Sequence, residues 1–182
     1  MKNFKRSDPL FSLCGLNCGL CPMYVGKYCP GCGGGAGNQS CAIARCSREH
    51  GGIEFCYLCG EYPCGKYDGI DRYDSFITHR NRRKDLERAK TDPAACRAEL
   101  AEKMEILERL LGNYNDGRRK NLFCIAANLM EIGDLRAAAG EIEAKTRAGQ
   151  TLKEKAALAA ETLHAIAGKR GIVLKLNKKP SE

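Results

Sequence analysis

Cysteine is the residue of this 182-residue chain whose number and spacing point most directly to chemistry. The chain has 12 cysteines, and all but two of them precede residue 65. The clustered thiols belong to Cys14, Cys18, Cys21, Cys29, Cys32, Cys41, Cys46, Cys56, Cys59 and Cys64. Thiols at this density can pair as disulfides, hold metal ions or act as nucleophiles, and their spacing helps to decide among these chemistries.

Three C-x-x-C pairs occur in this region, namely Cys18/Cys21, Cys29/Cys32 and Cys56/Cys59. Each pair can turn two sulfur atoms toward one ion at ligand distance. In the second and third pairs a glycine follows the second cysteine, which lets backbone amides approach the thiolates. An even cysteine count would also fit a disulfide framework, but the repeated pair favours metal.

The start of the chain bears on the compartment, and hence on the redox state of the thiols. Asp8 and Pro9 interrupt the basic start, and no apolar run of the length of a signal peptide follows. No stretch approaches the roughly 18 to 20 apolar residues that a membrane helix needs. We therefore expect a cytoplasmic protein with no membrane partner, in which thiols stay reduced and closely spaced cysteines bind metal.

Zinc is the metal that an all-thiolate set suits best, because four sulfurs close a tetrahedral, structural site. Ten cysteines would fill two such sites and leave two over, so we expect about two Zn²⁺ per chain. A sequential division would draw one site from Cys14–Cys32 and the other from Cys41–Cys64, whereas an interleaved division or bridging sulfurs would use the same residues. An iron–sulfur cluster is the alternative cofactor, because thiolates also ligate those clusters.

Two features depart from this interpretation. Cys14, Cys18 and Cys21 have the C-x-x-x-C-x-x-C spacing of radical SAM enzymes, but more cysteine and then helix follow, and no large α/β barrel is indicated. His50 lies four residues after Cys46, at a spacing that could replace a thiolate by an imidazole. We interpret His50 as a surface residue.

The order "CGLNCGLCPMY", "CPGC", "CAIARC" and "GIEFCYLCGEYPC" resembles the bacterial and archaeal family known as domain of unknown function 3795. The resemblance covers about residues 14–66. It implies zinc at the ten clustered cysteines, because members of that family are regarded as zinc-binding proteins. It implies no particular activity.

Two parts of different composition must position these thiols. Residues 1–70 contain few large apolar side chains, so we expect metal ions bound by the cysteines to stabilise this module. We also expect the module to have little regular structure. Residues 71–182 have helical periodicity, so we expect an all-α bundle of about five helices. Its first helix is predicted over 73–90, and the others around the following segments: 93–111, "RKNLFCIAANLM", "DLRAAAGEIEAK" and 151–166.

Local signals support the ends of these helices. Asp92 before Pro93 is a typical helix start, followed by an apolar stripe through Cys96, Leu100, Met104, Leu107 and Leu111. A capping box of Thr151 and Glu154 precedes the stripe Leu152, Ala156, Ala159, Leu163 and Ile166. Cys96 and Cys124 lie within helical segments, and we expect both to be buried apolar residues. We expect His79 and His164 to be ordinary helix residues. None of these four residues is expected to bind metal.

Charge and motifs narrow the function. The formal net charge of +8 would fall to about +4 if eight thiolates bound two zinc ions. Basic residues cluster at 80–84, at 118–120 and in the last fourteen residues, so a nucleic-acid-binding protein is one alternative. Acidic residues are interleaved with them, which favours solvated helix faces instead.

No hydrolase, P-loop or metalloprotease signature is visible, which argues against an enzyme. The sequence thus favours a structural zinc protein with a protein-binding or adaptor role, with an iron–sulfur protein in electron transfer or redox sensing as the other alternative.

Overall fold

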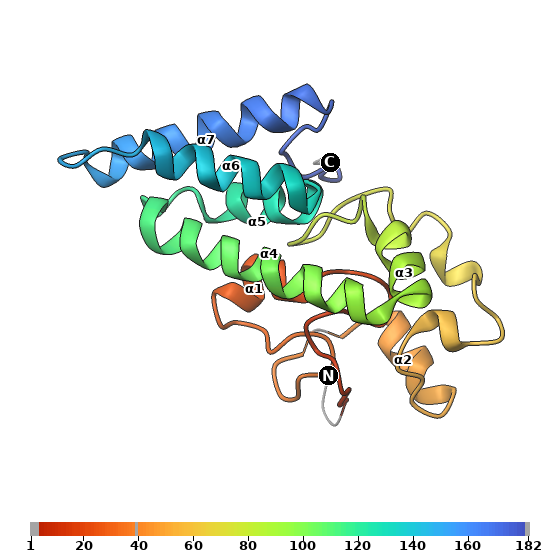
Figure 1. Cartoon of the computed structure of the whole chain (residues 1–182). Helices are drawn as coiled ribbons and strands as arrows, with labels where there is room; N and C mark the ends of the chain where they lie inside the picture. Colours follow the sequence, from red (N-terminus) through yellow and green to blue (C-terminus); the bar gives the residue numbers. More distant parts are fainter. Residues whose placement is uncertain (1–3, 39, 181–182) are drawn as a thin grey trace. The chain divides into compact units, whose positions relative to one another are not determined.

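The structure is a computed structural model that describes residues 4–38 and 40–180 (Figure 1). Within these ranges the chain is mostly helical, with seven α-helices and no strand. The helices are α1 (Pro22–Val25), α2 (Ala42–Glu49), α3 (Arg82–Thr91), α4 (Pro93–Tyr114), α5 (Lys120–Leu129), α6 (Ile132–Lys145) and α7 (Leu152–Lys169). None of the described helices is long and apolar enough to cross a membrane.

The helix count exceeds the predicted number of about five because the cysteine-rich part contributes α1 and α2. That part also contains three single-turn 3₁₀ helices, η1 (Cys18–Leu20), η2 (Cys56–Leu58) and η3 (Gly65–Tyr67). All of these elements are short, and long loops connect them.

The chain divides into two compact units. Unit 1 comprises 1–98 and 177–182, and unit 2 comprises 99–176, so that α4 runs from one into the other. The division predicted at residue 70 rests on a change of composition, and it stays a prediction.

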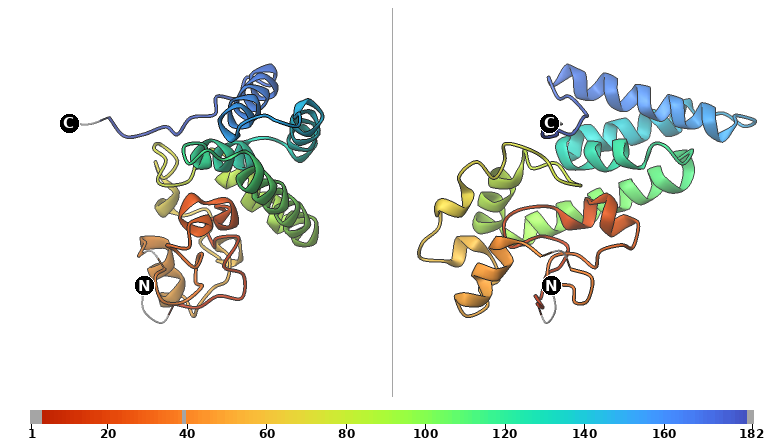
Figure 2. Two further views of the ribbon diagram at one scale, coloured as in Figure 1. Left: turned by 90° about the vertical axis from the view of Figure 1, so that its left-hand side faces the viewer. Right: turned by 180° about the vertical axis from the view of Figure 1, so that it is seen from behind.

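Unit 2 is a helical layer with a core of aliphatic side chains and alanine. Helices α6 and α7 run side by side, and α5 also packs against α7 (Figure 2). Phe123, Leu135, Ile142 and Leu163 are fully buried there, together with several alanines that allow the helices to approach closely. The predicted capping box at the start of α7 is confirmed, since Thr151 and Glu154 each bond the other's backbone N–H.

Helix α4 begins where the sequence predicts. The Asp92 carboxylate accepts a hydrogen bond from the Ala95 N–H at 2.9 Å, which caps the first turn. The buried face differs in part from the predicted stripe: Leu100 and Leu107 are buried, but Cys96 is only half-buried. Lys103 is buried instead, and its ammonium pairs with Glu99 at 3.0 Å.

The helix predicted over 73–90 is wrong in its first part, because α3 begins only at Arg82. Asp74 accounts for the difference. Its carboxylate accepts hydrogen bonds from the His79 N–H at 2.7 Å and from the Thr78 hydroxyl at 3.5 Å, and such side-chain-to-backbone bonds compete with helix formation. His79 is therefore a buried loop residue rather than a helix residue.

A second set of bonds at Asp74 comes from residues 177–178. The Asn177 N–H donates to the Asp74 carboxylate at 2.7 Å, and the Asp74 N–H donates to the Asn177 carbonyl at 2.7 Å. The Asn177 side-chain amide adds a bond to the Arg72 carbonyl, and the Lys178 ammonium adds one to the Ser75 carbonyl. Residues 177–178 thus form a strap across the 70–79 loop, within unit 1.

Replacing Asp74 by Asn should destabilise unit 1 by about 1 to 3 kcal/mol. The carboxylate accepts hydrogen bonds from two backbone N–H groups, whereas the side-chain NH₂ of asparagine is a donor and cannot accept one of them. Chemical denaturation followed by circular dichroism measures this change. Asp68→Asn is the matched control, since Asp68 is an exposed aspartate of the same unit. Equal stability of the two variants would contradict this role for Asp74.

His79 predicts how stability depends on pH. Burial lowers the pKa of His79 below its ordinary value of 6.5, with a further lowering by Arg82 and an opposing effect of its bond to the Ile70 carbonyl. Unfolded His79 therefore takes up a proton at a higher pH than folded His79, and stability should fall as pH decreases below about 6.5. His79→Gln should flatten this part of the pH–stability curve, whereas His164→Gln, at an exposed position, should leave it as in the wild type.

Candidate metal centre

The Arg6 side chain connects the loops that carry the thiols. It is 2% exposed, and its guanidinium donates to the carbonyls of Phe11, Cys32 and Glu54 at 2.8 to 3.1 Å. It also pairs with the Glu54 carboxylate at 3.3 Å and lies over the Phe55 ring. One buried cation therefore joins the first residues of the described chain to loops 26 and 48 residues further along.

The backbone that follows Arg6 continues this role. The Pro9 carbonyl accepts from the Cys32 N–H at 2.9 Å, and the Leu13 carbonyl accepts from the Cys56 N–H at 2.8 Å. Gly15 turns the chain with a positive φ of 97° close to the Arg82 carbonyl, where a Cβ would clash. Residues 4–14 are thus bonded to cysteines of two different C-x-x-C pairs.

Two of the C-x-x-C pairs have the same local structure. Cys18–Leu20 and Cys56–Leu58 each form a 3₁₀ turn, closed by a 3.0 Å bond from the N–H of the next cysteine to the carbonyl of the first. The sequence signal for this repeat is C-x-L-C-x-x-Y, which occurs at 18–24 and again at 56–62. Spacing of cysteines alone does not reveal it, because the shared leucine and tyrosine carry the repeat.

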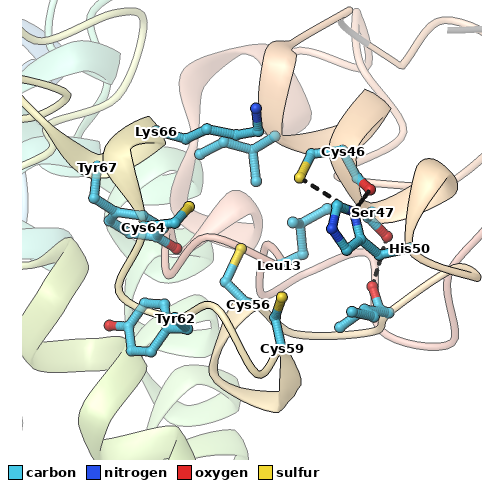
Figure 3. A pocket seen from close by; sticks show the side chains of 12 residues that line it. Leu13, Cys46, Ser47, His50, Cys56, Cys59, Tyr62, Cys64, Lys66 and Tyr67 are labelled. Atoms are coloured by element: carbon cyan, nitrogen blue, oxygen red, sulfur yellow. Dashed lines mark hydrogen bonds between the residues drawn. The ribbon is translucent and has the colours of Figure 1, made fainter.

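Four thiols line one cavity of about 30 Å³ (Figure 3). They come from α2, from both ends of the η2 turn and from the residue before η3, and we call them the second thiol group: Cys46, Cys56, Cys59 and Cys64. A space of this size is enough for a single ion or water molecule. The fifth cysteine of the sequential division, Cys41, does not line this cavity.

The thiols of this group influence one another. Burial first, and then the neighbouring Cys14, Cys64 and Cys46, raise the pKa of Cys56 to about 12, against a lowering by the Tyr67 hydroxyl. The pKa of Cys46 is also raised, first by desolvation and then by Cys64 and other anions, while Lys66 lowers it. Without a metal these two thiols are protonated at neutral pH, and a bound ion would displace the protons.

Tyr67 is the residue of the cavity that the sequence did not single out. Its side chain is 3% exposed, yet its hydroxyl makes no hydrogen bond of ordinary geometry. The hydroxyl nevertheless lies near enough to Cys56 that burial and the Cys56 sulfur together raise the pKa of Tyr67. The buried hydroxyl is thus a donor that lies beside the thiols of this cavity.

His50 lies at the edge of the same cavity rather than away from it. Its Nδ1 is 3.6 Å from the Cys46 sulfur, and its Nε2 is 3.6 Å from a Glu61 oxygen. Cys46, His50 and Glu61 are thus arranged in the order of the nucleophile, base and carboxylate of a catalytic triad. However, Nδ1 is also 2.9 Å from the Cys46 carbonyl, which can only accept, so Nδ1 carries a proton there. Because the pKa of Cys46 is raised rather than lowered, the arrangement does not make an activated thiolate.

The remaining clustered cysteines do not line this cavity, and we call them the first thiol group: Cys14, Cys18, Cys21, Cys29, Cys32 and Cys41. Burial, then Cys32, Cys14 and Cys21, hold the pKa of Cys18 well above its ordinary value. Burial likewise raises the pKa of Cys32 to about 11, with Arg6 lowering it and Cys14 and Cys41 raising it. Cys41 thus acts electrostatically on Cys32, and in this grouping it falls with the cysteines that precede it in the sequence.

Backbone amides face several sulfur atoms of the first thiol group. The Ala44 N–H donates to the Cys41 sulfur at 3.3 Å, where Cys41 caps α2. The N–H groups of Met23 and Tyr24 lower the pKa of Cys21, against the larger effect of burial. Amides directed at sulfur are the outer contacts that a metal-bound thiolate needs.

The donors fit a metal in type and in grouping, but their side chains do not converge on one point. Among the described residues, no three His, Cys, Asp or Glu side chains stand close enough together to share an ion. All twelve cysteines are free thiols. An ion would have to draw the sulfur atoms of each group inward.

The other predicted residues lie elsewhere. Cys124 is buried inside α5, His164 is exposed on α7, and neither they nor Cys96 line the cavity. Of the basic cluster at 80–84, Arg82 is 3% exposed and pairs with Asp71, and Arg83 pairs with Asp71 and donates to the Tyr67 carbonyl. Both arginines are engaged within unit 1.

Comparison with family models, with curated proteins and with solved structures found no match for this chain. The resemblance of residues 14–66 to the family named above therefore stays a prediction, and the case for function rests on the geometry of the thiols.

Arg6→Lys should lower the stability of unit 1 by about 2 kcal/mol or more. Lysine keeps the positive charge, but its ammonium lacks the planar set of donors with which the guanidinium reaches three buried carbonyls. Thermal unfolding of the full chain measures this. Arg147→Lys, at an exposed position in the loop before α7, is the matched control. A melting temperature equal to that of the control would show that charge alone suffices.

Proposed function

We propose that this chain is a zinc-binding protein in which thiolate sites build unit 1, and that the second thiol group is one of those sites. The observation that carries the proposal is the cavity lined by Cys46, Cys56, Cys59 and Cys64. Cys56, Cys59 and Cys64 come from one stretch of sequence, and Cys46 joins them from α2. Four thiols around one small cavity are the ligand type and number that four-coordinate zinc requires, once the ion draws their sulfur atoms inward.

The composition of unit 1 supports the same function. Its buried apolar residues before residue 70 are few and include Phe4, Phe11, Leu13, Leu20 and Ile43. Apolar burial on this scale stabilises a module of this size only marginally, so that a further crosslink is needed. Bound zinc would supply it, because binding energy at a site that exists only in the folded chain is folding energy.

Zinc held by four thiolates is closed to substrate and acts as a structural ion. The chain's own residues would then balance the site's charge, since four thiolates and one Zn²⁺ carry a net charge of about −2. Lys66 lines the cavity of the second thiol group, and Arg6 lies beside Cys32 of the first. Each thiol group thus has a cation that offsets its negative charge.

A protein partner is the role that such a module supports best. Leu58 is 61% exposed between Cys56 and Cys59, and Tyr28 is 69% exposed directly before Cys29. A metal-fixed turn would hold an apolar side chain out into solvent in one conformation, which reduces the entropy lost on binding. An adaptor role in the cytoplasm, with about two zinc ions per chain, is therefore our proposal.

An iron–sulfur cluster would use the same thiols, and the experiment below distinguishes it from zinc. A nucleic-acid partner is not proposed, because Arg82 and Arg83 of the most concentrated basic cluster are engaged with Asp71.

Protein purified without oxygen should contain about two zinc ions per chain and show no visible absorption. Cys56→Ser and Cys59→Ser should each lose about one zinc ion, because an alcohol is a poor replacement for a thiolate ligand. Elemental analysis with an ultraviolet–visible spectrum measures both. Cys96→Ser is the control and should keep the wild-type zinc content.

Two results would contradict the proposal. Iron with sulfide and a brown colour would replace zinc by a cluster and turn the function toward redox chemistry. Full zinc content in both Cys56→Ser and Cys59→Ser would remove the second thiol group from the ligands.

A further inference from the structure

Contacts to the ring and backbone of Tyr67 fix the direction of its hydroxyl group. The ring is held on two sides: the Tyr62 ring meets it edge-to-face at 5.2 Å, and the Arg83 guanidinium lies over it at 6.0 Å. Arg83 also donates to the Tyr67 carbonyl at 2.8 Å, which fixes the backbone of η3. With ring and backbone fixed, the hydroxyl cannot turn out to water.

Tyr62 lines the same cavity and provides a contrast within it. The Tyr62 hydroxyl donates to the Glu87 carboxylate at 3.1 Å, so its hydrogen-bonding capacity is used outside the thiol group. The Tyr67 hydroxyl is buried and has no such bond. In Figure 3 it is directed toward the space between Cys64 and Cys56.

A buried hydroxyl left without a partner costs about 1 to 3 kcal/mol, so a partner is expected in the functional form of the protein. A protonated thiol is a weak acceptor, whereas a metal-bound thiolate is anionic and accepts strongly. Loading the second thiol group with zinc would therefore convert the neighbour of Tyr67 from a poor acceptor into a good one.

We propose that Tyr67 is a positioning residue of the second thiol group, whose hydroxyl donates a hydrogen bond to the Cys56 sulfur when metal is bound. This inference rests on the proposed zinc site. It assigns the regulation of that site's reactivity: a donated hydrogen bond withdraws electron density from the sulfur and makes it a weaker nucleophile. With this hydrogen bond the zinc-bound thiolate would react slowly with electrophiles, as expected of a structural site. Without it, the thiolate would accept alkyl groups more readily.

The test compares zinc-loaded, full-length wild type, Tyr67→Phe and Tyr62→Phe in their reaction with iodoacetamide. In this reaction the thiolate lone pair forms an S–C bond, the C–I bond breaks and iodide leaves with the electron pair, so that zinc loses a ligand. Tyr67→Phe should react about tenfold faster at Cys56, which corresponds to the loss of one charge-assisted hydrogen bond. Tyr62→Phe should react at the wild-type rate. Mass spectrometry locates the modified cysteine, and a chromophoric chelator reports the released zinc.

A second measurement uses Co²⁺ in place of zinc. Loss of the hydrogen bond should move the sulfur-to-cobalt charge-transfer band to lower energy in Tyr67→Phe and leave it in place in Tyr62→Phe. This measurement separates an effect on the sulfur from a general loosening of the fold, because loosening alone leaves the band's energy unchanged.

The outcomes separate the two proposals. If wild type binds no zinc, the zinc site and this inference both fail. If wild type binds zinc but Tyr67→Phe matches Tyr62→Phe in rate and band position, Tyr67 has no such role, while the zinc site stands. Should Tyr67→Phe fail to fold, the wild type loaded with ¹¹³Cd decides: a hydroxyl proton of Tyr67 coupled to cadmium in the NMR spectrum supports the bond, and its absence overturns it.

Discussion

The buried guanidinium of Arg6 is the interaction on which the arrangement of the thiols depends. Arginine offers five donors in one rigid plane, and here that plane meets carbonyls from Phe11, Cys32 and Glu54. This one side chain joins segments that are far apart in sequence, in addition to the few buried apolar residues of the unit. The same positive charge lies beside Cys32, so structure and electrostatics have a common origin.

The two units of the chain solve the problem of stability in different ways. Unit 2 buries leucine, isoleucine and alanine between helices, at the packing density typical of protein cores. Unit 1 relies on polar contacts: Arg6 with Glu54, the carboxylate of Asp74, and Asn17 bonded to Asp85 at 2.8 Å. Hydrogen bonds of this kind specify one arrangement of loops, but their net contribution to stability is small. A metal requirement in unit 1 alone is consistent with this difference.

The helices after residue 90 could be predicted because their signals are local, whereas the loop at 73–81 could not. Asp92, the capping box at Thr151 and the break at 115–117 are each read within a few residues. The donors that hold Asp74 include Asn177, more than one hundred residues away in sequence, and propensity carries no information about such a contact. The same distinction applies to the candidate site: cysteine spacing identified the thiols, but which of them share a cavity depends on where the backbone turns. Tyr67 and Arg6 carry no motif, and only burial distinguishes them from others of their type.

The strap formed by residues 177–178 has a consequence for how the protein is made. The 70–79 loop obtains its last hydrogen bonds from residues that leave the ribosome about one hundred positions later. During synthesis the cysteines of unit 1 and the whole of unit 2 therefore precede the residues that close that loop. A segment translated late therefore secures a unit whose cysteines were translated early.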